Sequence, residues 1–170
     1  MSVAKKTAYC GVLTALALIF SYVESLLPVN FGVPGIKLGL ANLIVLLGLY
    51  FLKPGYVLVI SVMRIMLAGF MFGNAMSIIY SLAGGVLSFI VMVILKKTNV
   101  FSITGMSIAG AVSHNAGQLI VAILVVSTGK LVFYLPALMV AGVLTGALIG
   151  IAAGGIINVV SREAGRSMKK

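Results

Sequence analysis

Apolar residues form long runs along this chain, and short polar segments separate them. The runs cover residues 7–27, 38–52, 55–72, 75–95, 102–127 and 131–160. A helix that crosses a bilayer needs about 20 mostly apolar residues. The pattern therefore predicts an all-α membrane protein of six transmembrane helices, which forms a single integral membrane domain over residues 1–170.

The segments between the runs contain residues that end helices. Two prolines and two glycines lie within residues 28–35, and Pro54 and Gly73 mark later breaks. The second run is short, and Gly35, Gly39 and Asn42 lie at its start. Irregular backbone at membrane depth is tolerated only where it is buried or lines a cavity. We therefore expect the start of this second run to be irregular.

Composition supports the membrane assignment and narrows the chemistry. Hydrophobic residues make up 62% of the chain and charged residues 8%, whereas a soluble domain has about 25% charged residues. The net charge of +10 comes from basic residues that lie between apolar runs, so membrane topology explains it better than nucleic-acid binding. The single Cys10 cannot form an internal disulfide, and no His/Cys set predicts a metal site or a cofactor.

The distribution of the basic residues predicts the orientation. With the N-terminus in the cytoplasm, only Lys37 and Lys130 lie outside. The basic residues then inside are Lys5, Lys6, Lys53, Lys96, Lys97, Arg162, Arg166, Lys169 and Lys170. By the positive-inside rule, both termini are predicted to be cytoplasmic and the loop of residues 28–35 to face outward.

Charged residues within the spans are candidates for a functional site. Arg64 lies near the middle of the third run, and Glu24 lies near the outer end of the first. A charge at the bilayer centre costs about 2.5–3.5 kcal/mol on insertion scales, so Arg64 needs a partner. Glu24 is a candidate partner for Arg64 or for Lys37. The arrangement is either an ion pair that locks helices together or part of a ligand site.

A second polar group lies in the fifth run. His114 and Asn115 are adjacent, and Gln118 follows them by four and three positions. We therefore expect all three to share one side of a helix. Unpaired amide or imidazole groups at membrane depth are costly, which leaves helix packing or ligand binding as their role. Three further residues are candidates to complete a binding site, namely Asn42, Asn74 and Tyr80.

Small residues recur every third or fourth position in two helices. The first set is Ala4, Ala8, Gly11 and Ala15; the second is Gly142, Gly146, Gly150 and Gly154. Such stripes let helices approach closely, either within the bundle or against a partner membrane protein.

Three motifs together resemble a known membrane family. They are GIKLGLANL at residues 35–43, the segment from Arg64 through Gly73-Asn74 to Gly84-Gly85, and SHNAGQ at residues 113–118. The chain resembles the Gx transporter family, also labelled heptaprenyl diphosphate synthase component I. That family is similar to the substrate-binding S components of energy-coupling factor (ECF) transporters.

The resemblance implies a six-helix S-component-like bundle in the cytoplasmic (inner) membrane of a prokaryote. It would capture a small metabolite, such as a vitamin, a cofactor precursor or an isoprenoid-related compound, from the outer face. The stripe from Ala4 to Ala15 would dock a transmembrane coupling subunit that works with cytoplasmic ATPases.

The word synthase in the family name does not lead us to expect that this chain catalyses prenyl transfer. Prenyl diphosphate chemistry needs Mg²⁺ held by carboxylates, and the chain has no Asp and only two Glu. No phosphate-binding loop with a Walker lysine is present, so any ATP hydrolysis must come from a partner. Two alternatives stay open: a non-catalytic accessory subunit of isoprenoid or quinone metabolism, and a component of an extracytoplasmic redox system.

Overall fold

A computed structural model describes residues 3–26 and 39–167, and the side chains of residues 4–26 and 39–162. All regular secondary structure in these ranges is helical. The helices are α1 (Val3–Leu26), α2 (Asn42–Phe51), α3 (Pro54–Phe72), α4 (Ala75–Thr98), α5 (Ile103–Val126), the 3₁₀ helix η1 (Gly129–Tyr134) and α6 (Leu135–Ser167).

The prediction of six α-helices in a membrane protein is confirmed. Five helices are long and apolar enough to cross a bilayer, and α2, with 10 residues, is shorter. The last helix differs from its predicted bounds of 131–160, because residues 129–134 form the 3₁₀ turn and α6 continues to Ser167. The predicted outward loop of residues 28–35 and Lys37 lie outside the described residues.

Local sequence signals explain where α4 and α5 begin and where α4 ends. The side-chain oxygen of Asn74 accepts a hydrogen bond of 2.8 Å from the Ser77 amide, and Ser102 caps α5 by accepting one of 3.1 Å from the Gly105 amide. Both satisfy amides that the first helical turn leaves unpaired. Asn99 ends α4 in the left-handed conformation, with φ of 53°, a conformation that asparagine tolerates better than most residues.

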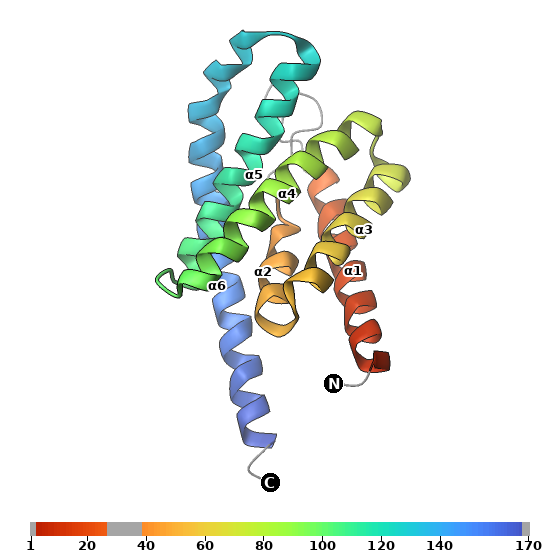
Figure 1. Cartoon of the computed structure of the whole chain (residues 1–170), viewed down its shortest axis with the longest axis vertical. Helices are drawn as coiled ribbons and strands as arrows, with labels where there is room; N and C mark the ends of the chain where they lie inside the picture. Colours follow the sequence, from red (N-terminus) through yellow and green to blue (C-terminus); the bar gives the residue numbers. More distant parts are fainter. Residues whose placement is uncertain (1–2, 27–38, 168–170) are drawn as a thin grey trace.

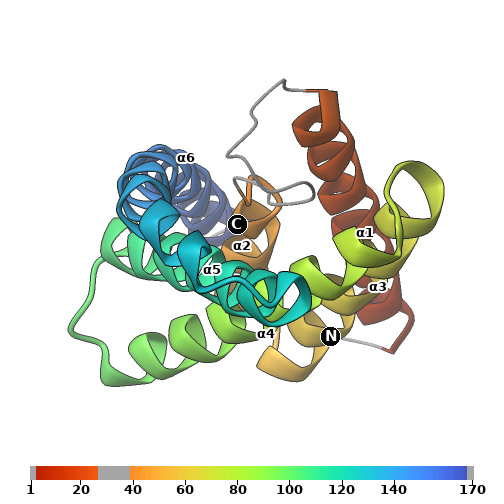
Figure 2. The same ribbon diagram turned by 90° about the horizontal axis from the view of Figure 1, so that it is seen from above.

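The long helices form an open row around α2. In this row α6 packs on α5, α5 on α4, α4 on α3 and α3 on α1, while α2 contacts all five helices. Figure 2 shows α2 inside this curved row, with α1 and α6 at its two ends. Both termini lie at the same end of the bundle (Figure 1). The order of packing leaves α1 and α6 without contact in the described part of the chain.

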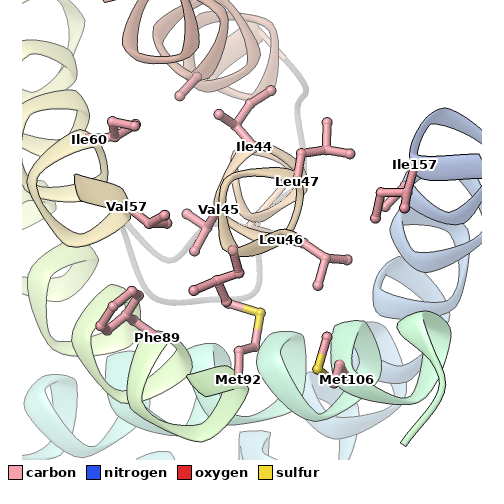
Figure 3. Packing of buried hydrophobic residues seen from close by; sticks show 13 residues of the cluster. Ile44, Val45, Leu46, Leu47, Val57, Ile60, Phe89, Met92, Met106 and Ile157 are labelled. Carbon is pink, nitrogen blue, oxygen red and sulfur yellow. The ribbon is translucent and has the colours of Figure 1, made fainter. Parts of the chain in front are cut away.

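The central position of α2 follows from its sequence. Residues Ile44 to Leu49 are all buried, which is typical of a helix that is apolar on every side. Figure 3 shows its side chains pointing in several directions toward the helices that surround it, including toward Met92 and Ile157. Since lipid is as apolar as these side chains, close packing contacts rather than transfer from water stabilise the arrangement.

The C-terminus of α2 is held by a charge. The Lys96 ammonium donates a hydrogen bond to the Leu49 carbonyl and lies 5.0 Å from the centre of the Tyr50 ring. A cation is favoured there because the last carbonyls of a helix are unpaired and carry partial negative charge.

Three glycines of the α6 stripe, Gly142, Gly146 and Gly150, pack against α5, whereas a Cβ atom added at Gly154 would meet only the Ile103 side chain, at 4.0 Å. A Cβ atom added at Gly146 would lie 2.6 Å from the Ile108 Cα atom, and one at Gly150 would lie 2.6 Å from the Thr104 Cα atom. Gly142 also packs closely, against the backbone of Val112 in α5. These glycines therefore allow α5 and α6 to approach until their backbones nearly touch.

Candidate functional site

Buried polar side chains from four helices meet near the N-terminus of α2. We call these side chains, together with Gly39, whose backbone amide takes part, the polar layer; its members are Ser21, Glu24, Gly39, Asn42, Arg64, His114 and Gln118. All seven residues are buried. Polar groups removed from water are costly unless they find hydrogen-bond partners, so the partners of each group indicate what the layer does.

Arg64 of α3 is almost completely buried, with 4% of its surface exposed. Its Nη1 atom donates a hydrogen bond of 3.3 Å to the Ser21 hydroxyl of α1. Its Nε and Nη2 atoms have no hydrogen-bond partner among the described residues. A guanidinium carries five N–H donors in a planar fork, and within the described residues one of them is accepted, by the Ser21 hydroxyl.

Glu24 connects α1 to the start of α2. Its Oε1 atom accepts a short hydrogen bond from the Gly39 amide and another of 3.4 Å from the Leu40 amide. Gly39 has φ of 85°, in the left-handed region that favours glycine. The carboxylate thus lies at the positive end of α2, where an anion is stabilised.

The sequence predicted Glu24 as a partner of Arg64 or Lys37, and the structure refines this. Glu24 lies close enough for its charge to act on Arg64. The single side-chain hydrogen bond of Arg64 within the described residues nevertheless goes to Ser21, not to the carboxylate. Lys37 lies outside the described residues.

His114 and Gln118 of α5 pack against a glycine of α4. A Cβ atom added at Gly84 would lie 2.8 Å from Gln118 Cγ and 3.0 Å from His114 Nδ1. A Cβ atom added at Gly39 would lie 3.1 Å from Asn42 Nδ2 and 3.5 Å from His114 Cδ2. The two glycines therefore leave the space that brings His114, Gln118 and the start of α2 together.

Asn115 faces a different helix from His114 and Gln118. Its Nδ2 atom donates a hydrogen bond of 2.8 Å to the Leu138 carbonyl of α6. Successive helical residues are about 100° apart around the axis, so Asn115 turns toward α6 while His114 and Gln118 turn toward α4. This side chain joins α5 to α6, and it is not in the polar layer.

Two other predicted site residues lie away from the layer. Asn74 is exposed and caps α4. Tyr80 is buried with Leu119 and Leu138 in an apolar cluster between α4, α5 and α6. The structure therefore brings together Glu24, Asn42, Arg64, His114 and Gln118 of the predicted residues.

Three residues of this region were not among the predicted site residues, namely Ser21, Gly39 and Gly84. Ser21 precedes Glu24 by three positions, which places both on one face of α1 and is a signal that the sequence contained. The role of Gly39 depends on a hydrogen bond to a residue 15 positions earlier, which no local pattern reveals.

The chemistry of the layer favours binding an anion or a zwitterion. Its donors include the guanidinium of Arg64 and the amide of Asn42, whose Nδ2 atom has no hydrogen-bond partner in the described part of the chain. Its one carboxylate, Glu24, already accepts two backbone amides. Within residues 4–26 and 39–162, no three His, Cys, Asp or Glu side chains come close enough to hold a metal ion.

Comparison with known proteins gives one match. The sequence profile of a family described as heptaprenyl diphosphate synthase component I matches residues 13–156. The matched range includes every residue of the polar layer. No curated protein and no solved structure matches the chain.

Proposed function

The chain belongs to the heptaprenyl diphosphate synthase component I family, and we propose that it is a membrane-embedded substrate-binding subunit of a transporter. In this proposal it corresponds to the S component of an ECF-type transporter and captures a small anionic or zwitterionic metabolite for uptake. The observation that carries the proposal is the buried Arg64, whose Nε and Nη2 atoms lack hydrogen-bond partners among the described residues.

Arg64 is poorly explained as a purely structural residue. A buried charge without adequate partners destabilises a protein, and charged residues inside membrane proteins usually face a substrate path or a cavity. A carboxylate or phosphate oxygen pair matches the planar guanidinium fork. A ligand of that chemistry would supply the partners that Ser21 alone does not.

The short helix α2 supports a ligand site at the same place. Its 10 residues span about 15 Å, roughly half of the hydrocarbon thickness. A helix that begins inside the membrane exposes unpaired backbone amides there, and membrane transporters use such helix ends to bind substrates. In this chain Glu24 already accepts two amides at that end, so the anionic group of the ligand is assigned to Arg64.

We also propose that the exposed stripe on α1 docks a transmembrane coupling subunit, which in turn works with cytoplasmic ATPases. Ala4, Ala8, Gly11 and Ala15 are all exposed. A Cβ atom added at Gly11 would meet nothing within 4 Å, unlike those added at Gly142, Gly146 and Gly150 of α6. The stripe is therefore free to receive a helix from another protein.

A second function is favoured by the description of the family. As a synthase component, the chain would be a membrane accessory subunit that does not catalyse prenyl transfer itself. Its lack of Asp leaves it without the carboxylates that would hold Mg²⁺ for that reaction.

Copurification from native membranes discriminates between these functions. The full-length chain, extracted gently from its own membrane, should copurify with a transmembrane protein and with ATPases, either one that has two ATPase domains or two separate subunits. A Gly11→Leu variant expressed at the same level should recover far less of them. Recovery of a prenyl diphosphate synthase without ATPases would support the accessory subunit, and a coloured or redox-active partner would support a redox component.

The proposed orientation places both termini in the cytoplasm of a prokaryotic cell. In a Cys10→Ser background, Phe133→Cys in η1 should react with a membrane-impermeant thiol reagent in intact cells. Val100→Cys, in the turn between α4 and α5, should react only after lysis. Phe133 is 85% exposed and Val100 is 80% exposed. A difference in their labelling therefore reports the side of the membrane on which each residue lies. The reverse pattern of labelling would invert the topology.

A further inference from the structure

Two side chains of the polar layer are almost fully buried and have donors without partners. Arg64 is 4% exposed, and its Nε and Nη2 atoms have no hydrogen-bond partner among the described residues. Asn42 is 5% exposed, and the same is true of its Nδ2 atom. Buried donors without partners cost free energy. All three atoms carry N–H groups, so a ligand that satisfies them must accept hydrogen bonds.

The two unpaired nitrogens of Arg64 form one edge of its guanidinium. In this planar group the Nε–H bond and one N–H bond of Nη2 point the same way, and this edge can donate to two oxygens of a carboxylate or phosphate in parallel. The Nη1 atom, which donates to the Ser21 hydroxyl, lies outside the edge. The contact with Ser21 therefore leaves a complete bidentate site for an oxyanion.

Contacts connect Arg64 of α3 to Asn42 of α2 through α1. Arg64 donates to Ser21 of α1, and Glu24 lies about one turn further along that helix. Glu24 accepts the Gly39 amide, and a Cβ atom added at Gly39 would lie 3.1 Å from Asn42 Nδ2. The three donors therefore belong to one connected group of residues.

The backbone amides at the start of α2 are already in use. Glu24 accepts two of them. Those of residues 42–44 donate to carbonyls three positions earlier, at 2.8 to 3.1 Å. The donors that remain for a ligand at this helix end are therefore the side chains of Arg64 and Asn42.

The layer offers little to a positively charged group. Glu24 provides the only carboxylate among the described side chains, which do not include that of Glu163. Its Oε1 atom already accepts two backbone amides. An ammonium would also be repelled by the charge of Arg64, because like charges interact more strongly in a protein interior than in water.

We propose that the polar layer recognises an organic anion whose polar end carries acceptors and no ammonium group. A carboxylate or phosphate lies on the Nε–Nη2 edge of Arg64. A second acceptor, either a neighbouring carbonyl or a third phosphate oxygen, receives the hydrogen bond of Asn42 Nδ2. The inference rests on the proposed transport function and narrows its substrate from anions and zwitterions to acids such as 2-oxo acids, N-acyl amino acids and phosphate esters. Asn42 then distinguishes one acid from another.

Three acids with the same carbon skeleton test this proposal. Next to the carboxylate, 2-oxohexanoate has a carbonyl, hexanoate has a methylene group and norleucine has an ammonium. The affinity of the full-length chain in detergent for each acid is measured from the rise in melting temperature with concentration. 2-Oxohexanoate should bind about fivefold more tightly than hexanoate, as expected for one net hydrogen bond. Norleucine should bind more weakly than hexanoate.

Asn42→Leu should remove the preference for 2-oxohexanoate over hexanoate, because only the contact to the carbonyl is lost. The variant should fold, since leucine has a similar size and replaces a buried amide whose Nδ2 atom has no partner in the described chain. Asn42→Asp, which puts an acceptor in place of the donor, should remove the preference too. Asn115→Ala is the control: Asn115 is also buried but donates to Leu138 outside the layer, so the preference should persist.

Three results would overturn the inference while the proposed function stands. They are binding of norleucine as tight as that of hexanoate, equal binding of 2-oxohexanoate and hexanoate by the wild type, and a preference that persists in Asn42→Leu and Asn42→Asp. Binding of none of the three acids would also overturn it, because the free edge of Arg64 should accept any accessible carboxylate. The proposed function fails separately, if the wild type extracted from its own membrane retains no small molecule.

Discussion

Gly146→Leu should strongly destabilise the folded chain, because even the Cβ atom of the new side chain would lie 2.6 Å from the Ile108 Cα atom of α5. Backbone atoms cannot rotate away as a flexible side chain can. Overpacking a well-packed interior costs about 1–3 kcal/mol, and we expect about 3 kcal/mol or more here because α6 must move away from α5. Thermal unfolding followed by circular dichroism in detergent measures the loss.

Gly11→Leu is the matched control for this prediction. It makes the same substitution in the other small-residue stripe, where an added Cβ atom meets nothing within 4 Å. Its melting temperature should stay within a few degrees of the wild type. If Gly11→Leu unfolds as readily as Gly146→Leu, the α1 stripe packs inside the protein and is not a docking surface.

The fold could largely be predicted from the sequence because its signals are local. Long apolar runs predicted the helices, and prolines and glycines such as Pro54 and Gly73 predicted where they break. The surroundings of α2 could not be predicted in this way. That helix is held at its two ends by Glu24 and Lys96, which lie 15 and 47 positions from their hydrogen-bond partners Gly39 and Leu49.

The candidate site could be predicted only in part for the same reason. Helical spacing correctly placed His114 and Gln118 together. It did not separate them from Asn115, because which neighbour a residue faces depends on where α4 and α6 lie around α5. The burial of Arg64 could be predicted from its position in an apolar run, but its contact with Ser21 depends on how α1 packs on α3.

Arg64→Met should abolish ligand binding while leaving the ligand-free protein folded. Methionine keeps an unbranched side chain of similar reach in the apolar interior, so it removes the charge without leaving a large cavity. Removing one partner of a buried charge pair costs about 2–5 kcal/mol of binding free energy, which is a loss of affinity of about 30-fold or more.

Two further measurements separate this result from a structural effect. Arg64→Lys keeps the charge but loses the planar fork, so it should bind more weakly than the wild type and more tightly than Arg64→Met. The melting temperature of ligand-free Arg64→Met should stay close to that of the ligand-free wild type. A structural ion pair would behave differently, because breaking it would cost about 3–5 kcal/mol of stability.

Native mass spectrometry of the chain purified from its own membrane tests the central claim most directly. The wild type and Arg64→Met are extracted in the same mild detergent, and the bound small molecule per chain is measured for each. We expect the wild type to retain an anionic or zwitterionic metabolite and folded Arg64→Met to retain almost none. Equal retention by both proteins would contradict the assignment of the polar layer as the ligand site.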